Sequence, residues 1–239
     1  MRRARAIVAL DVAGAADAVA LAERLGDACD FVKVGSELFT AAGPSVVEAV
    51  RRRTEAGGGD RDVFLDLKLH DIPNTVRAAA RRAAALGARL VTVHATGGRE
   101  MLEAAADGAG DGCGVLAVTV LTSLDGAALG EAWGRTVSDV QAEVLRLSSL
   151  ARSAGVRGVV CSGFEAGAVR AEHGDALEIL VPGVRLAGSG AHDQKRVVTP
   201  GGAAAAGANY VVIGRTVTQD PDPRVALARV RAELLASPS

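Results

Sequence analysis

The chain has 239 residues, of which 49% are hydrophobic and 23% charged, and its 27 basic and 28 acidic side chains leave a formal net charge of −1. This balance excludes the overall positive field by which a protein concentrates on nucleic acid or on an anionic membrane surface. Only 3% of the residues are aromatic, which argues against a platform for stacking nucleic-acid bases.

Eight short aliphatic runs recur along the chain, and stretches rich in Ala, Leu, Arg and Glu at helical spacing separate them. The runs cover residues 7–10, 31–34, 63–68, 90–93, 115–120, 156–161, 179–181 and 210–213. The clearest helical stretches cover residues 15–25, 74–86, 137–154 and 223–235. Glycine follows several of these helical stretches, at Gly26, Gly87, Gly155 and Gly207. This is typical of helices that end on a residue in the left-handed conformation.

The alternation of eight strands with helices predicts a (β/α)8 TIM barrel. Continuously apolar strands are what a parallel sheet covered on both faces requires, and eight such units close into a barrel of roughly 250 residues. An open, doubly wound parallel sheet is the alternative fold. No Pro- or Ser-rich linker divides the chain, so we expect residues 1–239 to form a single domain.

The basic opening and the apolar run after it superficially imitate a secretion signal, but Asp11 and Asp17 interrupt the run before an apolar core of signal length forms. No apolar run approaches the roughly 18 residues that a membrane helix needs. The three cysteines are widely spaced and follow no zinc or disulfide pattern. We therefore expect a cytoplasmic protein that binds neither membrane nor nucleic acid and holds no metal.

The third apolar run carries charged residues where a barrel strand ends. Asp66 and Lys68 are two residues apart, so strand periodicity directs both side chains into the barrel interior. With Asp71 just past this strand, and with Asp11 and Lys33 at the first two strands, one rim gathers three carboxylates and two ammonium groups. Buried charges are costly, and barrel enzymes carry their chemistry at this rim. The set predicts a catalytic array, with a structural ion-pair network as the alternative.

Glycine and arginine follow the seventh and eighth runs, in Pro182-Gly183-Val184-Arg185 and in Gly214-Arg215. Backbone N–H groups and guanidinium forks at these two strand ends are typical of a phosphate site in a barrel. The polar stretch 186–198 between the two runs suits a lid over that phosphate, with an ordinary solvated loop as the alternative. His94 ends the fourth run and either lines the site or is a structural histidine.

The run Asp66-x-Lys68-x-x-Asp71-Ile72-Pro73-Asn74-Thr75 closely resembles the bacterial type of the orotidine 5′-phosphate decarboxylase family. Matching segments at other strands extend the resemblance over residues 10–215. They are Leu10-Asp11, Phe31 to Gly35, Leu121-Thr122-Ser123, Val181 to Arg185 and Gly214-Arg215. The resemblance implies a carboxy-lyase that converts orotidine 5′-phosphate to uridine 5′-phosphate, the last step of de novo pyrimidine synthesis, without a metal or organic cofactor.

The resemblance also implies a role for each matching residue. Lys68 resembles the proton donor to C6 of the pyrimidine, and Asp66 resembles the carboxylate beside the departing carbon dioxide. Asp71 completes the array from the partner subunit of a homodimer, while Lys33 and Asp11 resemble the groups that hold the array and the ribose hydroxyls. The other substrate-binding residues implied are Thr75 and Pro182, Thr122 and Ser123 in the pyrimidine loop, and Arg185, Gln194, Gly214 and Arg215 at the phosphate.

Three other functions compete with this one. Related barrels such as 3-keto-L-gulonate 6-phosphate decarboxylase and hexulose-6-phosphate synthase share the Asp-x-Lys-x-x-Asp strand, but they use magnesium, held partly by a glutamate where this chain has Lys33. A tryptophan- or histidine-pathway barrel shares the phosphate loops but lacks the charged third strand. A catalytically silent sensor of a phosphate ligand would need only the anion site, so the presence of Asp66, Lys68 and Asp71 argues against it.

Overall fold

The computed structural model describes residues 3–52, 60–186 and 198–236. Within these ranges eight strands follow one another in chain order. They are β1 (Arg5–Ala9), β2 (Phe31–Gly35), β3 (Asp62–Leu69), β4 (Leu90–His94), β5 (Gly114–Val118), β6 (Gly158–Val160), β7 (Glu178–Val181) and β8 (Tyr210–Ile213). Each strand pairs in parallel with the next, and β8 pairs with β1, from Arg5 opposite Tyr210 to Val8 opposite Ile213. The sheet is therefore a closed barrel, as predicted, and the open-sheet alternative is wrong.

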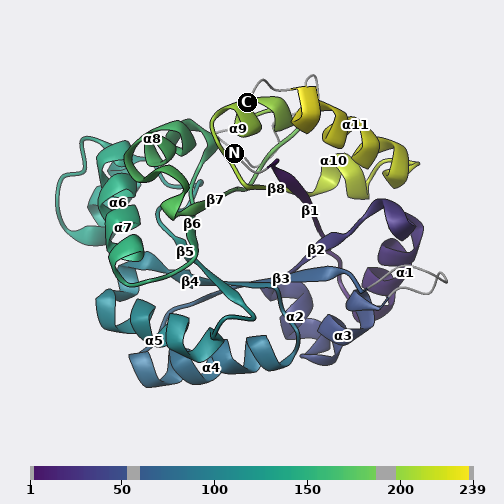
Figure 1. Ribbon diagram of the computed structural model, residues 1–239, viewed down its shortest axis with the longest axis horizontal. Coiled ribbons are helices and arrows are strands. Elements are labelled where there is room, and N and C mark those ends of the chain that lie inside the picture. The colour runs from purple at the N-terminus through teal and green to yellow at the C-terminus, as the bar shows by residue number, and fades with distance from the viewer. Residues whose placement is uncertain (1–2, 53–59, 187–197, 237–239) are drawn as a thin grey trace.

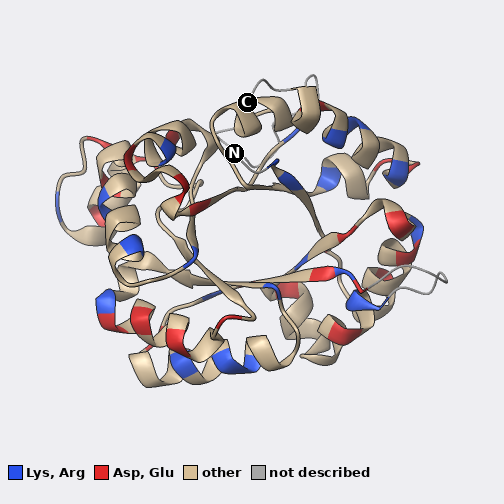
Figure 2. Cartoon of the chain, in the orientation of Figure 1, with Lys and Arg blue, Asp and Glu red and all other residues tan. Residues whose placement is uncertain are grey.

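Helices surround the barrel and cover the outer face of the sheet (Figure 1). They are α1 (Ala15–Leu25), α2 (Ser36–Ala42), α3 (Ser45–Arg51), α4 (Pro73–Ala85), α5 (Arg99–Ala109), α6 (Gly126–Trp133), α7 (Val140–Ser153), α8 (Gly163–His173), α9 (Pro200–Ala205), α10 (Arg215–Thr218) and α11 (Pro223–Ala236), with the 3-10 turns η1 (Gly26–Ala28), η2 (Ala95–Gly97) and η3 (Gly174–Ala176). None of the helices in the described ranges has the length and apolar character needed to cross a membrane. Basic and acidic residues are interspersed along these helices (Figure 2).

The alternation of side chains along each strand divides the apolar core into two layers. One layer, which includes Val8, Val32 and Val91, packs between the sheet and the helices. The other fills the inside of the barrel with Ile7, Ala9, Phe31, Phe64, Leu90, Leu116, Val118, Val160, Leu180, Tyr210 and Val212. Because the side-chain period of a strand is two residues, the residue two positions after an inner-layer side chain also faces the barrel interior, one level nearer the carboxyl ends of the strands.

Candidate active site

A cavity of about 300 Å³ opens at the carboxyl ends of the strands, and its lining joins apolar side chains of the inner layer to charged and polar groups above them. Strands β1, β2, β3, β5, β6, β7 and β8, or the loops that follow them, all contribute. The lining residues are Ala9, Asp11, Lys33, Phe64, Asp66, Lys68, Val118, Val120, Leu121, Thr122, Val160, Leu180, Pro182, Gly183, Val184, Arg185, Val212, Gly214 and Arg215. This is the end of the barrel at which TIM-barrel enzymes carry their active sites.

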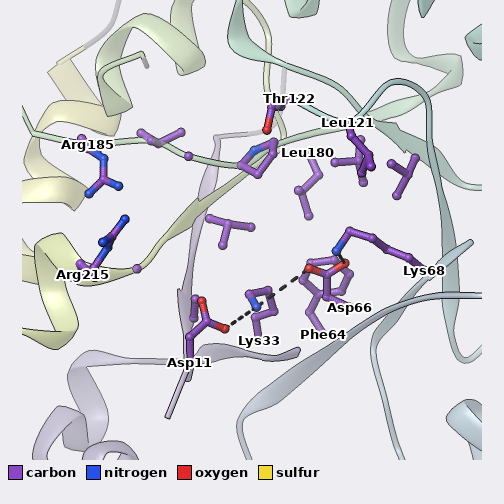
Figure 3. A pocket seen from close by; sticks show the side chains of 18 of the residues that line it. Asp11, Lys33, Phe64, Asp66, Lys68, Leu121, Thr122, Leu180, Arg185 and Arg215 are labelled. Carbon is purple, nitrogen blue, oxygen red and sulfur yellow. Dashed lines mark hydrogen bonds and ion pairs between the residues drawn. The ribbon is translucent and has the colours of Figure 1, made fainter. Parts of the chain in front are cut away.

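Four charged side chains of alternating sign form a chain along one wall of the cavity (Figure 3). Lys33 Nζ lies 2.7 Å from Asp11 Oδ1 and 3.9 Å from Asp66 Oδ2. Lys68 Nζ donates to Asp66 Oδ1 at 2.8 Å. The side chain of Asp66, 17% exposed, is therefore held between two ammonium groups, whereas that of Lys68 is 36% exposed at the cavity. Four of the five charged residues that the sequence places at this rim therefore meet at the cavity, and Asp71 is not among them.

The local structure of β3 at the array is irregular. Regular pairing with β4 places Leu65 opposite Val91 and then Leu69 opposite Val93, so a bulge separates the two pairs. Inside the bulge Lys68 has φ +50°, the sole positive φ of a non-glycine residue in the described ranges. Regular strand alternation alone was predicted to place the side chains of Asp66 and Lys68 on the same face. The structure instead brings them together through a left-handed residue, which pairing periodicity does not reveal.

Sequence reasoning missed one residue of this site, Thr92. It lies in the middle of β4 and is fully buried. Its hydroxyl donates to Asp66 Oδ1 at 3.0 Å and accepts the backbone N–H of Lys68 at 2.9 Å. The available signal was a hydroxyl residue in an otherwise aliphatic strand, two positions after the inner-layer Leu90 and therefore facing the barrel interior.

Arg185 and Arg215 direct their guanidinium groups toward one another on the side of the cavity opposite Lys68 (Figure 3). Gly183 has φ +70°, a conformation that favours glycine, and Gly214 is the N-cap of α10. Arg185 is buried, and its Nε has no hydrogen-bond partner within the described residues. A buried donor without a partner is rare in proteins, and this one lies beside a second arginine. The pair can therefore bind an anion such as a phosphate group.

The remaining predicted substrate-binding residues are spread over different places. Thr122 and Pro182 line the cavity. Asp71, Thr75 and Ser123 are exposed and do not line it within this single chain. The backbone N–H of Ile72 donates to Asp71 Oδ1 at 2.6 Å, and the Ile72 side chain is itself 67% exposed. The strand-end loop that carries Asp71 thus presents both a carboxylate and an apolar side chain to its surroundings.

Gln194, and the predicted lid 186–198 except for its two ends, lie outside the described residues. The backbone N–H of Arg185, the residue just before this stretch, donates to the carbonyl of Val198, its last residue, at 3.0 Å.

His94 is not part of the cavity lining. Its ring is 5.4 Å from that of His70, centroid to centroid. Burial lowers the pKa of His94, and the nearby His70 and Lys68 lower it further against the opposing influence of Asp66. A neutral imidazole at pH 7 follows from this. Within the described part of the chain, no three His, Cys, Asp or Glu side chains are grouped so that they could hold a metal ion.

Comparisons with known proteins identify the family of this chain. Residues 4–230 match the model of the orotidine 5′-phosphate decarboxylase / HUMPS family. Orotidine 5′-phosphate decarboxylase of Anaeromyxobacter sp. (strain K) is 51% identical over 230 residues, which are 96% of this chain and 98% of the relative. The enzyme of the same name from Thermobifida fusca is 48% identical over 235 residues, 97% of each chain.

A similar solved structure is the crystal structure of orotidine 5′-phosphate decarboxylase from Lactobacillus acidophilus. It superposes with a TM-score of 0.83 at 36% sequence identity, over 98% of this chain and 100% of that one. The family match and the relatives both extend over nearly the whole length of the chain. This chain therefore belongs to the orotidine 5′-phosphate decarboxylase / HUMPS family.

Proposed function

We propose that this protein decarboxylates orotidine 5′-phosphate to uridine 5′-phosphate, the last step of de novo pyrimidine nucleotide synthesis. One observation carries the proposal: Asp66 is held between Lys33 and Lys68 on one wall of a cavity whose opposite side presents Arg185 and Arg215. A substrate with a carboxylate at one end and a phosphate at the other matches this separation of charges. The names of the relatives support the same reaction.

In the proposed mechanism, the bond between C6 of the pyrimidine and its carboxylate breaks, and the electron pair of that bond remains on C6 as carbon dioxide leaves. Lys68 then transfers a proton from Nζ to C6. Asp66 lies beside the departing carboxylate, and two unit charges about 4 Å apart repel each other by about 4 kcal/mol at an effective dielectric constant of ~20. Loss of carbon dioxide relieves that repulsion. The array therefore stabilises the transition state more than it stabilises the bound substrate.

The other residues bind the remote parts of the substrate. Asp11 and Lys33 hold the charged array and the ribose hydroxyls. Thr122 and Ser123 contact the pyrimidine, Thr75 and Pro182 also bind the substrate, and Arg185, Gln194, Gly214 and Arg215 bind the phosphate. Phosphate binding far from C6 supplies binding energy that can assemble the site around the reacting carbon.

A magnesium-dependent sugar-phosphate decarboxylase of the same family is the weaker candidate. The ammonium group of Lys33 lies 2.7 Å from one carboxylate oxygen of Asp11 and 3.9 Å from one of Asp66. It thus lies between the two carboxylates that a divalent cation would need to approach. A positive charge fixed at that point opposes a second one. We therefore propose a reaction that uses no cofactor.

The test is turnover of orotidine 5′-phosphate by the purified protein in the presence of EDTA. Turnover is measured as the loss of substrate absorbance or as the release of carbon dioxide. Full activity is expected with the chelator present. Lys68→Ala should lower kcat by roughly 10³-fold or more, because it removes the proton donor and one partner of Asp66. Its thermal unfolding reports whether the barrel stays folded. Magnesium dependence, or an undiminished kcat in a folded Lys68→Ala protein, would contradict the assignment.

We also propose that the active protein is a homodimer in which Asp71 completes the active site of the partner subunit. Support comes from the exposure of Asp71 and from its absence from the lining of the cavity in its own chain. The strongly exposed Ile72 beside it offers apolar area to an interface.

We propose that residues 1–239 act as one cytoplasmic catalytic domain. The family match over residues 4–230 supports the single domain.

Mixing two inactive variants tests the shared site. After subunit exchange between Asp71→Asn and Lys68→Ala proteins, a mixed dimer holds one site with both changes and one site with neither. An equal mixture should therefore recover about a quarter of the wild-type activity. Each variant alone, at the same total concentration, is the control. Activity of the mixture no higher than the mean of the two variants would mean that Asp71 does not act across subunits.

A further inference from the structure

We infer that Thr92 is a positioning residue, whose hydroxyl holds Asp66 and Lys68 in the arrangement that the reaction requires. The inference rests on the proposed function, because the reaction it concerns is the decarboxylation. Thr92 does not line the cavity, so it acts through the two residues that do.

The environment of Thr92 is one in which a hydroxyl group needs a specific reason to be present. Thr92 is fully buried in the middle of β4, and its place in the alternation, two residues after Leu90, directs it into the barrel. Its register partner on β5 is the apolar Leu116. A buried hydroxyl is unfavourable unless it is hydrogen-bonded, and here both its hydrogen and a lone pair are used.

Both hydrogen bonds of Thr92 go to the catalytic strand. The hydroxyl donates to Asp66 Oδ1 at 3.0 Å, and that same oxygen accepts a hydrogen bond from Lys68 Nζ at 2.8 Å. The hydroxyl also accepts the backbone N–H of Lys68 at 2.9 Å. Thr92 therefore orients the carboxylate that pairs with the proton donor, and it anchors the main chain of the proton donor itself.

These bonds lie where the regular ladder between β3 and β4 is interrupted. Pairing stops after Leu65 opposite Val91 and resumes at Leu69 opposite Val93, so Thr92 is the β4 residue opposite the bulge. Its side chain thus takes up a backbone N–H that the ladder leaves free. Lys68 has φ +50° there, a conformation that L-residues adopt at a cost and keep only when their surroundings enforce it.

Loss of the hydroxyl should release this constraint. Without an acceptor for its N–H, the peptide at Lys68 can relax toward an extended conformation, and the direction of the ammonium group changes with it. Small misplacements of a catalytic group lower rates strongly, because productive geometry is narrow. Binding of the phosphate by Arg185 and Arg215, on the opposite side of the cavity, is not affected by such a change.

The experiment compares Thr92→Val, which removes the hydroxyl at nearly constant volume, with Thr92→Ser, which keeps it. We expect kcat for orotidine 5′-phosphate to fall roughly 10- to 100-fold in Thr92→Val and to stay within about threefold in Thr92→Ser. KM, and the affinity for the product uridine 5′-phosphate measured by calorimetry, should change by less than about twofold in both. Thr92→Ala serves instead if the valine variant does not fold.

Thr119→Val is the matched control. Thr119 is likewise buried, its hydroxyl donates to the carbonyl of Val160 at 2.9 Å, and it is absent from the cavity lining. This variant should keep the wild-type kcat. An equal fall of kcat in Thr119→Val, or a folded Thr92→Val with wild-type kcat, would overturn the inference and leave the proposed function intact.

A crystal structure of Thr92→Val provides a readout that does not depend on turnover. We expect the φ of Lys68 to leave the left-handed region, or Lys68 Nζ to move away from Asp66. Unchanged geometry at both places would overturn the inference even if the wild-type protein proved inactive on orotidine 5′-phosphate. Inactivity of the wild-type protein would count against the proposed function alone.

Discussion

At the scale of single residues, the charged side chains of the site form two groups, one suited to the reaction and one suited to phosphate binding. The alternating Asp11, Lys33, Asp66 and Lys68 run along one wall of the cavity, and the Lys68 end of this array lies opposite Arg185 and Arg215 (Figure 3). A guanidinium fork can bind a phosphate through two hydrogen bonds at once. The arginine side is therefore suited to affinity, and the Asp/Lys side to the reaction.

Replacing Arg215 tests this division of labour. Arg215→Ala should lower kcat/KM for orotidine 5′-phosphate by roughly 10²- to 10³-fold, because two charge-assisted hydrogen bonds contribute about 3–4 kcal/mol in total. With orotidine, which lacks the phosphate, the same variant should lose less than about threefold. Arg52→Ala, which changes an exposed arginine at the C-cap of α3, is the control. Equal losses with both substrates would show that Arg215 does not act on the phosphate.

At the scale of secondary-structure elements, the periodic patterns predicted most of the strands and helices well. The helix expected over residues 15–25 is α1, and the expected strand 210–213 is β8. Gly26, Gly87, Gly155 and Gly207 all have positive φ, as predicted for residues at helix ends. The bulge in β3 was not predicted, because a strand and its bulge share one pattern of apolar residues and differ in pairing with a neighbour distant along the chain.

A buried arginine that the sequence pattern does not mark, Arg61, links the C-terminal ends of α1 and α3 just before the start of β3. Arg61 donates hydrogen bonds to backbone carbonyl oxygens at the ends of these elements. They belong to Ala22, Gly26, Cys29 and Arg52, at 2.8, 3.2, 3.2 and 3.1 Å. Carbonyl groups at helix C-termini carry partial negative charge, so one guanidinium satisfies several of them at once. Only the folded arrangement brings these oxygens together.

At the scale of the whole molecule, ion pairs join the first three strands to the last helix. Arg5 of β1 donates to Asp30 at 3.1 Å and to Asp62 of β3 at 2.9 Å, and Arg231 of α11 donates to Asp30 at 2.6 Å. These groups lie at the amino ends of the strands, away from the cavity. In TIM barrels, residues important for activity typically lie at the carboxyl ends of the strands and residues important for stability at the amino ends. The network therefore contributes to stability at the end of the barrel that lies away from the cavity.

The pH dependence of stability should reflect Asp30. Burial raises the pKa of this carboxyl, but hydrogen bonding and charge from Arg5, with the charge of Arg231, outweigh burial and lower it. A lowered folded-state pKa stabilises the protein above the ordinary value of about 3.9. This contribution disappears as the pH falls through the folded-state value. Because these side chains are 39–46% exposed, we expect only about 0.5–1 kcal/mol.

Urea unfolding of the wild-type protein and of Asp30→Asn, over a series of pH values, measures the effect. The free energies of unfolding should differ at pH 7 and converge in acid. Asp111→Asn, at an exposed turn position, is the matched control and should change the free energy by less than about 0.5 kcal/mol at pH 7. A difference between wild type and Asp30→Asn that persists unchanged into acid would contradict this account.

The sequence by itself determined the barrel, because period-two and period-3.6 patterns are local, and eight apolar strands that need cover on both faces have few ways to pack. It also determined the charged array, since Asp11, Lys33, Asp66 and Lys68 stand at successive strand ends that a barrel gathers at one rim. Tertiary structure alone decided the left-handed conformation of Lys68 and the hydrogen bonds made by Thr92. Each of these depends on atoms that lie far apart along the chain and meet only when the strands pair and the barrel closes.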